Sequence, residues 1–76
     1  MSRLRWQCRR GMRELDKLLE GYLERRYDSA PPGEKAAFRA LLELSDPELG
    51  AYLLGRTPPG PEFAEVVRHI RDRTGS

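Results

Sequence analysis

The sequence has very few of the residues from which chemical sites are built: its 76 residues include one cysteine, Cys8, and one histidine, His69. A lone cysteine cannot form a disulfide within the chain, and one cysteine with one histidine falls short of the four ligands of a structural zinc site. No Gly-rich loop follows a strand-like segment, so there is neither a P-loop nor a dinucleotide-binding turn. We therefore expect no metal site, no catalytic residue and no cofactor bound tightly by the isolated chain, and we expect that it is not an enzyme.

The cysteine, the histidine and the neighbouring acids have simple structural interpretations. A nucleophile needs a base within hydrogen-bond reach. His69 has no evident partner among the arginines of its segment, so we expect it to be solvated on a helix face. Cys8 follows Leu4 at helical spacing, which favours a small buried hydrophobic side chain over a reactive thiol. Asp16 and Glu20 are one helical turn apart, and we expect them on a solvated face.

Long apolar runs are absent as well. No segment of about 18 apolar residues could cross a membrane, and there is no signal-type apolar region. With one unpaired cysteine, this predicts a soluble protein of a reducing compartment, the cytoplasm, without membrane insertion. A chain of this length has room for a single domain, residues 1–76. We expect a monomer that is ordered from about residue 3 to 73, with a flexible tail at 74–76.

No segment alternates apolar and polar residues with period two, so we expect no sheet. Apolar residues instead recur at steps of three and four, which predicts an all-α, compact five-helix bundle. The helices are expected at about residues 3–10, 12–27, 32–44, 46–54 and 63–70. The core of the bundle should contain Leu15, Leu19, Leu23, Phe38, Leu41, Leu42, Tyr52, Val66, Val67 and Ile70.

The ends of the helices carry local signals, two of which allow alternatives. Gly11 can end the first helix in a left-handed conformation, or it can be the N-cap of the second helix with Glu14 at the third helical position. The fourth helix can begin with a capping box of Ser45 and Glu48, or Asp46 can cap it directly.

Three further residues mark the other helices. Pro32 suits the first position of the third helix, and Gly55 should end the fourth. Gly21 lies inside the second helix at a cost of about 1 kcal/mol relative to alanine, which suggests that another backbone approaches it closely.

Positive charge is concentrated at the N-terminus. Residues 1–13 hold five arginines, Trp6 and no acid, whereas the remaining residues carry a net negative charge and the whole chain carries +2. The arginines are Arg3, Arg5, Arg9, Arg10 and Arg13. They can simply solubilise a short helix, bind nucleic acid, or contact a protein partner. An acidic remainder and the absence of a second basic helix weigh against nucleic acid, whereas arginine and tryptophan are enriched at protein interfaces.

The order and spacing of several short motifs are more specific than the charge. Arg10-Gly11-x-x-Glu14 follows Trp6-x-Cys8-Arg9 and precedes Tyr27-Asp28, Glu34-Lys35 and Asp46-Pro47-Glu48-Leu49. In this arrangement the chain closely resembles the succinate dehydrogenase flavinylation (FAD assembly) factor family, of the bacterial SdhE/YgfY type, from about Arg3 to Ile70. One departure is Pro31, where many relatives have a serine able to cap the third helix.

The resemblance implies an assembly factor, or specialised chaperone, that binds the apo form of the flavoprotein subunit of succinate dehydrogenase, and often of fumarate reductase. It would promote covalent attachment of FAD to a histidine of that subunit. The family's motif falls on Arg10, Gly11 and Glu14, and the expected contact surface adds Arg3, Trp6, Arg9, Arg13 and Asp46. The alternative is a small basic nucleic-acid-binding or antitoxin-type regulatory domain.

Overall fold

The computed structural model describes residues 2–72, and within them it contains five α-helices, one 3-10 turn and no strand. The elements are α1 (Ser2–Gln7), α2 (Arg13–Arg25), the 3-10 turn η1 (Tyr27–Ser29), α3 (Pro32–Leu41), α4 (Asp46–Leu53) and α5 (Pro61–Arg71). The all-α, five-helix prediction is confirmed. The expected order of residue 73 and flexibility of residues 74–76 fall outside the described residues.

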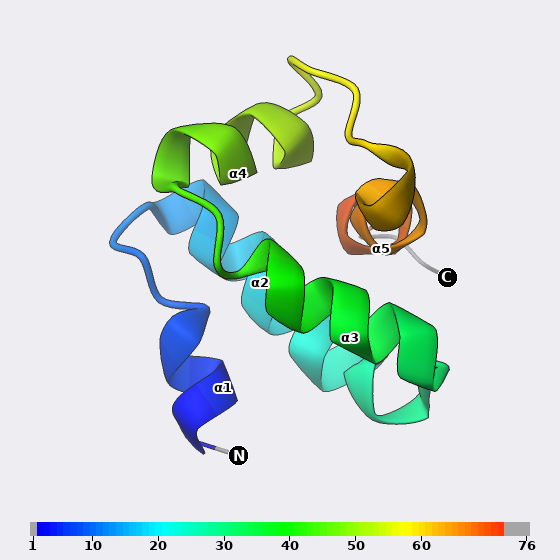
Figure 1. The fold of residues 1–76 in the computed structure, drawn as a ribbon. Coiled ribbons are helices and arrows are strands. Elements are labelled where there is room, and N and C mark those ends of the chain that lie inside the picture. The colour runs from blue at the N-terminus through cyan, green and yellow to red at the C-terminus, as the bar shows by residue number, and fades with distance from the viewer. Residues whose placement is uncertain (1, 73–76) are drawn as a thin grey trace.

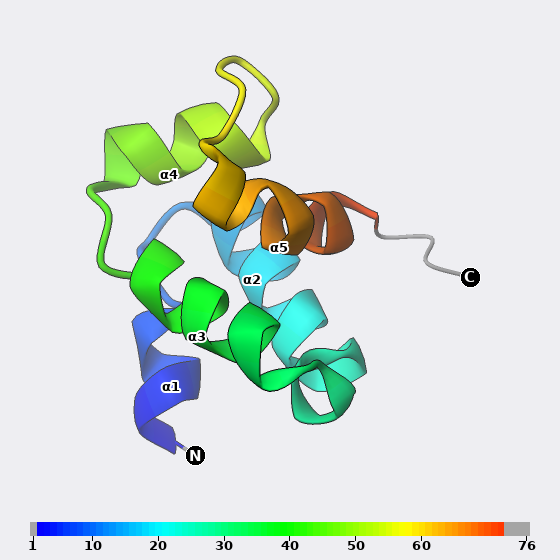
Figure 2. The same cartoon turned by 45° about the vertical axis from the view of Figure 1, so that its right-hand side comes forward.

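The long helix α2 runs through the middle of the molecule (Figure 1). Helices α3 and α5 pack against each other and α5 also packs on α2, while α4 contacts both α2 and α5. Figure 2 shows α4 beyond the N-terminal end of α2, on the side away from η1. The first helix, α1, lies below the start of α2 and is joined to it by a loop of five residues, 8–12.

One continuous core joins residues from all of these helices except α1, and the loop after α1 adds Cys8. Its buried members are Cys8, Leu15, Leu19, Tyr22, Leu23, Phe38, Leu41, Leu42, Leu49, Leu53, Val66, Val67 and Ile70. Nine of the ten predicted core residues are buried; the tenth, Tyr52, is half-buried and packs at the edge of the core beside Phe63. Cys8 is fully buried, as expected for a small hydrophobic side chain.

The fourth helix begins and ends as local signals predict. Ser45 is the N-cap and forms the capping box with Glu48, so the alternative with Asp46 as the cap is wrong. At the other end, Gly55 adopts φ +78°, and the N–H groups of Gly55 and Arg56 donate to carbonyl oxygens in the last turn of the helix. This pattern is a Schellman ending, which needs a left-handed residue. Pro32 is the first residue of α3, also as predicted.

The junction between α1 and α2 differs from both alternatives. α1 ends at Gln7, four residues before Gly11, and α2 has Met12 as its N-cap without a side-chain cap. Gly11 is left-handed, with φ +77°, but it turns the connecting loop and ends no helix. The reason is that Arg10 bonds outside the junction: its N–H donates to Asp16 of α2 at 2.8 Å, and its side chain donates to Asp46 at the start of α4.

The interpretation of Gly21 is wrong. A Cβ atom at this position would meet only the end of the Arg25 side chain, at 3.8 Å, and no other backbone. Gly50 is buried in α4, and a Cβ atom there would lie 3.6 Å from Leu15 Cδ1, an ordinary van der Waals contact. Across residues 2–72, no helix has the length and apolar character to span a lipid bilayer.

Candidate functional site

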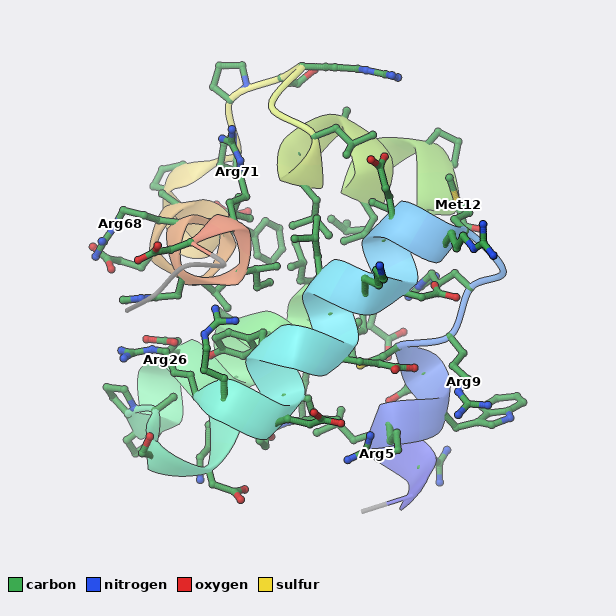
Figure 3. All side chains as sticks on the ribbon, turned by 180° about the vertical axis from the view of Figure 1, so that it is seen from behind. Arg5, Arg9, Met12, Arg26, Arg68 and Arg71 are labelled. Atoms are coloured by element: carbon green, nitrogen blue, oxygen red, sulfur yellow. The ribbon has the colours of Figure 1, made fainter. Side chains whose placement is uncertain are left out.

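The basic N-terminal segment is fastened to α2 by ion pairs. Arg5 Nη1 lies 3.0 Å from Glu24 Oε2, and Arg9 Nε lies 3.3 Å from Glu20 Oε2. In Figure 3, Arg5 extends from α1, and Arg9 extends from the loop that follows α1. Glu20 is therefore half-buried and paired, not simply solvated as expected. Two of the five N-terminal arginines thus have part of their charge neutralised within the fold.

Arg10 is the most enclosed of these arginines, with 16% of its side chain exposed. Its Nη1 atom donates to Asp46 Oδ1 at 3.0 Å, and Nη2 donates to the carbonyl oxygen of Leu42. Asp46 is available for this contact because Ser45, not Asp46, caps α4. The guanidinium group therefore joins the loop after α1 to the turn between α3 and α4.

A shallow hollow surrounds this contact. It is lined by Trp6, Gln7, Arg9, Arg10, Leu42 and Asp46. Trp6 is 74% exposed, although burying an indole side chain is strongly favourable. Arg10 Nε is buried and has no hydrogen-bond partner among the described residues. Four of the residues predicted as partner contacts thus lie together, from two parts of the sequence.

The remaining predicted contacts lie apart from this hollow. Gly11 and Arg13 are exposed in and just after the loop, and Arg3 is exposed on α1. Glu14 lines a different hollow, on α2, α4 and α5. The motif therefore spans two sides of the N-terminal end of α2, with Arg10 on one side and Glu14 on the other. Because Met12 is the N-cap, Glu14 makes no capping box.

Neither of the residues suited to acid, base or nucleophilic chemistry is part of this surface. Burial, and to a smaller degree the charge of Glu20, raises the pKa of the Cys8 thiol to about 11. A thiol that stays protonated is a poor nucleophile. Residues 2–72 contain no group of three histidine, cysteine, aspartate or glutamate side chains that could hold a metal ion.

His69 is not the solvated, partnerless histidine that the sequence suggested. Its side chain is 20% exposed, and Nε2 lies 3.5 Å from Glu65 Oε1 and 3.8 Å from Glu34 Oε1. The reason is that α5 packs along α3, which brings Glu34 to His69 from a helix 35 residues earlier in the chain.

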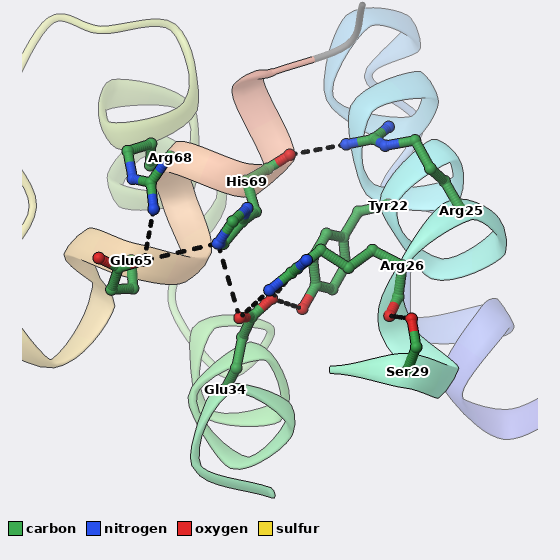
Figure 4. A network of polar contacts seen from close by, with 8 residues as sticks. All are labelled: Tyr22, Arg25, Arg26, Ser29, Glu34, Glu65, Arg68 and His69. Atoms are coloured by element: carbon green, nitrogen blue, oxygen red, sulfur yellow. Dashed lines mark hydrogen bonds and ion pairs between the residues drawn. The ribbon is translucent and has the colours of Figure 1, made fainter. Parts of the chain in front are cut away.

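Glu34 is the centre of a polar cluster that the sequence analysis missed (Figure 4). Its carboxylate is 8% exposed and accepts two hydrogen bonds from Arg26, at 2.8 and 3.0 Å, and one of 2.5 Å from the Tyr22 hydroxyl. The hydrogen bonds from Arg26 hold the pKa of Glu34 below its usual value. Burial, followed by the bond to Glu34, raises the pKa of Tyr22. No sequence pattern joins these residues, because each looks like an ordinary member of its own helix.

This cluster predicts a pH-dependent contribution to stability. Because the folded-state pKa of Glu34 is depressed, its charge stabilises the fold above the usual value of 4.5, and this contribution is lost as the pH falls through the lower folded-state pKa. Glu34→Gln should therefore lower the free energy of unfolding by about 1–2 kcal/mol near pH 7, with a smaller difference at pH 3. Urea unfolding at both pH values measures this. Exposed Glu43→Gln is the control, and an equal deficit for Glu34→Gln at both pH values would contradict the assignment.

Comparison with known proteins gives matches over nearly the whole chain. Residues 2–74 match the model of a protein family, Sdh5, described as "Flavinator of succinate dehydrogenase". A "FAD assembly factor SdhE" of Coxiella burnetii is 46% identical over 71 residues, which cover 92% of this chain and 87% of the relative. Proteins of the same name from Idiomarina loihiensis and Shewanella oneidensis are 43% and 42% identical, covering 93% and 96% of this chain and 80% and 90% of their own.

Proposed function

The chain belongs to the family of flavinators of succinate dehydrogenase, and on this basis we propose that it binds the flavoprotein subunit of succinate dehydrogenase before FAD is attached and promotes the covalent attachment. The names of the family and its relatives describe helpers of cofactor assembly, and the chain is such a helper and not an enzyme. The resemblance noted in the sequence is thereby confirmed at the level of the family.

A helper without catalytic groups can still accelerate flavin attachment. The bond between the flavin's 8-methyl carbon and a histidine is made by the chemistry of the flavin and the residues of the target subunit. Holding two reacting groups in a productive geometry can supply several kcal/mol of the barrier, because the entropy of alignment is lost on binding and not in the reaction step. The factor's contribution is therefore to bind and shape the subunit.

The observation that carries this proposal is the 74% exposed Trp6, which lies beside Arg9 and Arg10 at the hollow below α4. Tryptophan and arginine are the side chains that most often dominate the energy of protein interfaces. We propose that Trp6, Arg9 and Arg13 contact the subunit directly, with Arg3 at the rim. Gly11 and Glu14 belong to the same contact.

Arg10 and Asp46 have a double role in this proposal. Their mutual ion pair positions the loop that carries Gly11, and the remaining exposed part of Asp46 faces the partner. Because Arg10 Nε lacks a partner among the described residues, a carbonyl or carboxylate oxygen of the subunit that reached it would relieve a buried polar atom.

The pairing of Arg5 with Glu24 and of Arg9 with Glu20 favours this function over nucleic-acid binding. Duplex DNA and RNA bind through several free cations along the phosphate backbone, and internal pairing reduces their number here. No observation favours an antitoxin-type role.

We further propose that the factor acts as a cytoplasmic monomer, does not bind FAD tightly by itself, and accepts the flavoprotein subunit of fumarate reductase as a second client.

Binding of the purified chain to purified flavoprotein subunit tests the function. The immobilised chain should capture the apo subunit, retain the subunit that already carries covalent FAD less well, and bind duplex DNA weakly at physiological salt. The reverse pattern, with no capture of the apo subunit and duplex binding that falls steeply with salt, would replace this function with the nucleic-acid alternative.

A further inference from the structure

A second hollow lies on the other side of α2 from Trp6, where α2, α4 and α5 meet. It is lined by Glu14, Lys17, Leu18, Leu53, Leu54 and Arg71, and we call it the α2–α5 hollow. Leu53 is 2% exposed and belongs to the core, whereas Leu54 is 38% exposed and is one of three large hydrophobic side chains exposed among the described residues. The hollow therefore has an apolar floor with one accessible leucine.

The charged side chains around this floor have no polar partner among the described residues. Within residues 2–72, no hydrogen bond or ion pair joins the side chain of Glu14, Lys17 or Arg71 to another described residue. In contrast, the arginines facing α1, α3 and the outer side of α5 have carboxylate partners; these are Arg5, Arg9, Arg10, Arg26 and Arg68. With two cations and one acid, the rim has a net positive charge.

The end of the Arg71 side chain lies beside the turn that ends α4. A Cβ atom on Gly55 would lie 2.9 Å from Arg71 Nη2, so the guanidinium group packs where any other residue would have a side chain. Figure 3 shows Arg71 directed towards the loop that follows α4, while Arg68, one turn earlier on α5, points away from it. The absence of a side chain at Gly55 therefore leaves room for the Arg71 guanidinium group at this rim.

We propose that the α2–α5 hollow is a second contact for the flavoprotein subunit, and that it takes an apolar side chain of the subunit with a carboxylate next to it. This inference rests on the proposed function. Glu14 connects the two regions, because it belongs to the motif and lines this hollow. The apolar side chain would cover Leu54, and the carboxylate would pair with Arg71 and Lys17. The subunit thus contacts both sides of the N-terminal end of α2.

Two substitutions test the two halves of the contact. Leu54→Gln keeps the size of the side chain but removes its apolar surface, and Arg71→Glu reverses the charge. Each should weaken capture of the purified apo subunit by about tenfold or more, with circular dichroism and melting temperature close to wild type. Arg71→Lys, which keeps the charge, should recover a part of the affinity.

Arg68→Glu is the matched control, because it makes the same charge change one turn away on α5 and breaks only a surface pair with Glu65. It should bind like wild type. If wild type and both test variants capture the subunit equally, this inference is wrong while the proposed function stands; if wild type captures nothing, the proposed function itself fails. Self-association of wild type that Leu54→Gln abolishes would assign the hollow to a second copy of the chain and would also overturn the inference.

Discussion

A Gly11→Arg variant should fold with the same helix content as wild type and lose capture of the apo flavoprotein subunit, by about thirtyfold or more, together with its ability to promote flavin attachment. A loss of this size corresponds to about 2 kcal/mol, the scale of an interface hot spot. The variant should fold because nothing lies within 4 Å of a Cβ atom at this position. The backbone is left-handed at Gly11, with φ +77°, so the substitution costs about 1–2 kcal/mol of strain.

Two controls separate the causes of that loss. Gly11→Ala has the same backbone strain but almost no bulk, and it should keep most of the affinity. Gly33→Arg adds the same side chain at another exposed glycine with nothing within 4 Å of its Cβ, in the first turn of α3, and should bind like wild type. If Gly11→Arg retains full capture, or if Gly11→Ala is equally inactive, the loop does not contact the subunit in the way we propose.

An Arg10→Ala variant should be destabilised by about 2–4 kcal/mol, a large share of the stability of so small a domain. An arginine that only solubilised a short helix, one of the interpretations that the sequence allows, could be replaced with little effect on melting, but the structure indicates otherwise. Only 16% of the Arg10 side chain is exposed, and its loss leaves the Leu42 carbonyl oxygen and Asp46 without their donor. Urea unfolding monitored by circular dichroism measures the effect.

Arg9→Ala is the matched control for this measurement. Arg9 is 68% exposed and makes a single ion pair with Glu20, so its removal should cost less than about 1 kcal/mol. Arg10→Lys should fall between the two variants, since lysine keeps the charge but cannot donate from two nitrogens in a fixed plane. If Arg10→Ala unfolds at the same urea concentration as Arg9→Ala, the bridge between the loop and the turn before α4 does not hold the fold together.

The parts of the fold that the sequence predicted are those set by nearby residues. Leu15 and Leu19 show the helical period of a buried stripe, and Ser45 and Glu48 are three residues apart in one capping box. Such patterns depend only on local geometry, so they can be recognised without a structure. The start of α3 at Pro32 belongs to the same class.

The parts that the sequence could not predict depend on contacts between distant residues. The junction between α1 and α2 depends on the bonds of Arg10 to Asp16 and to Asp46, and the second of these joins residues that are 36 apart. In the same way, Glu34 meets Tyr22 only because α3 packs beside α2. The family resemblance puts Trp6 and Asp46 among the expected partner contacts, but no spacing in the sequence indicates that they line the same hollow.

The most direct test of the central claim is a reconstitution with three purified components: the apo flavoprotein subunit, FAD and this chain. Covalent flavin is measured over time by its fluorescence in a denaturing gel, where only covalently bound flavin stays with the protein. Our account predicts that the chain increases the rate of covalent attachment, and that Gly11→Arg abolishes the increase while Gly33→Arg does not. An equal rate with and without the chain would contradict it.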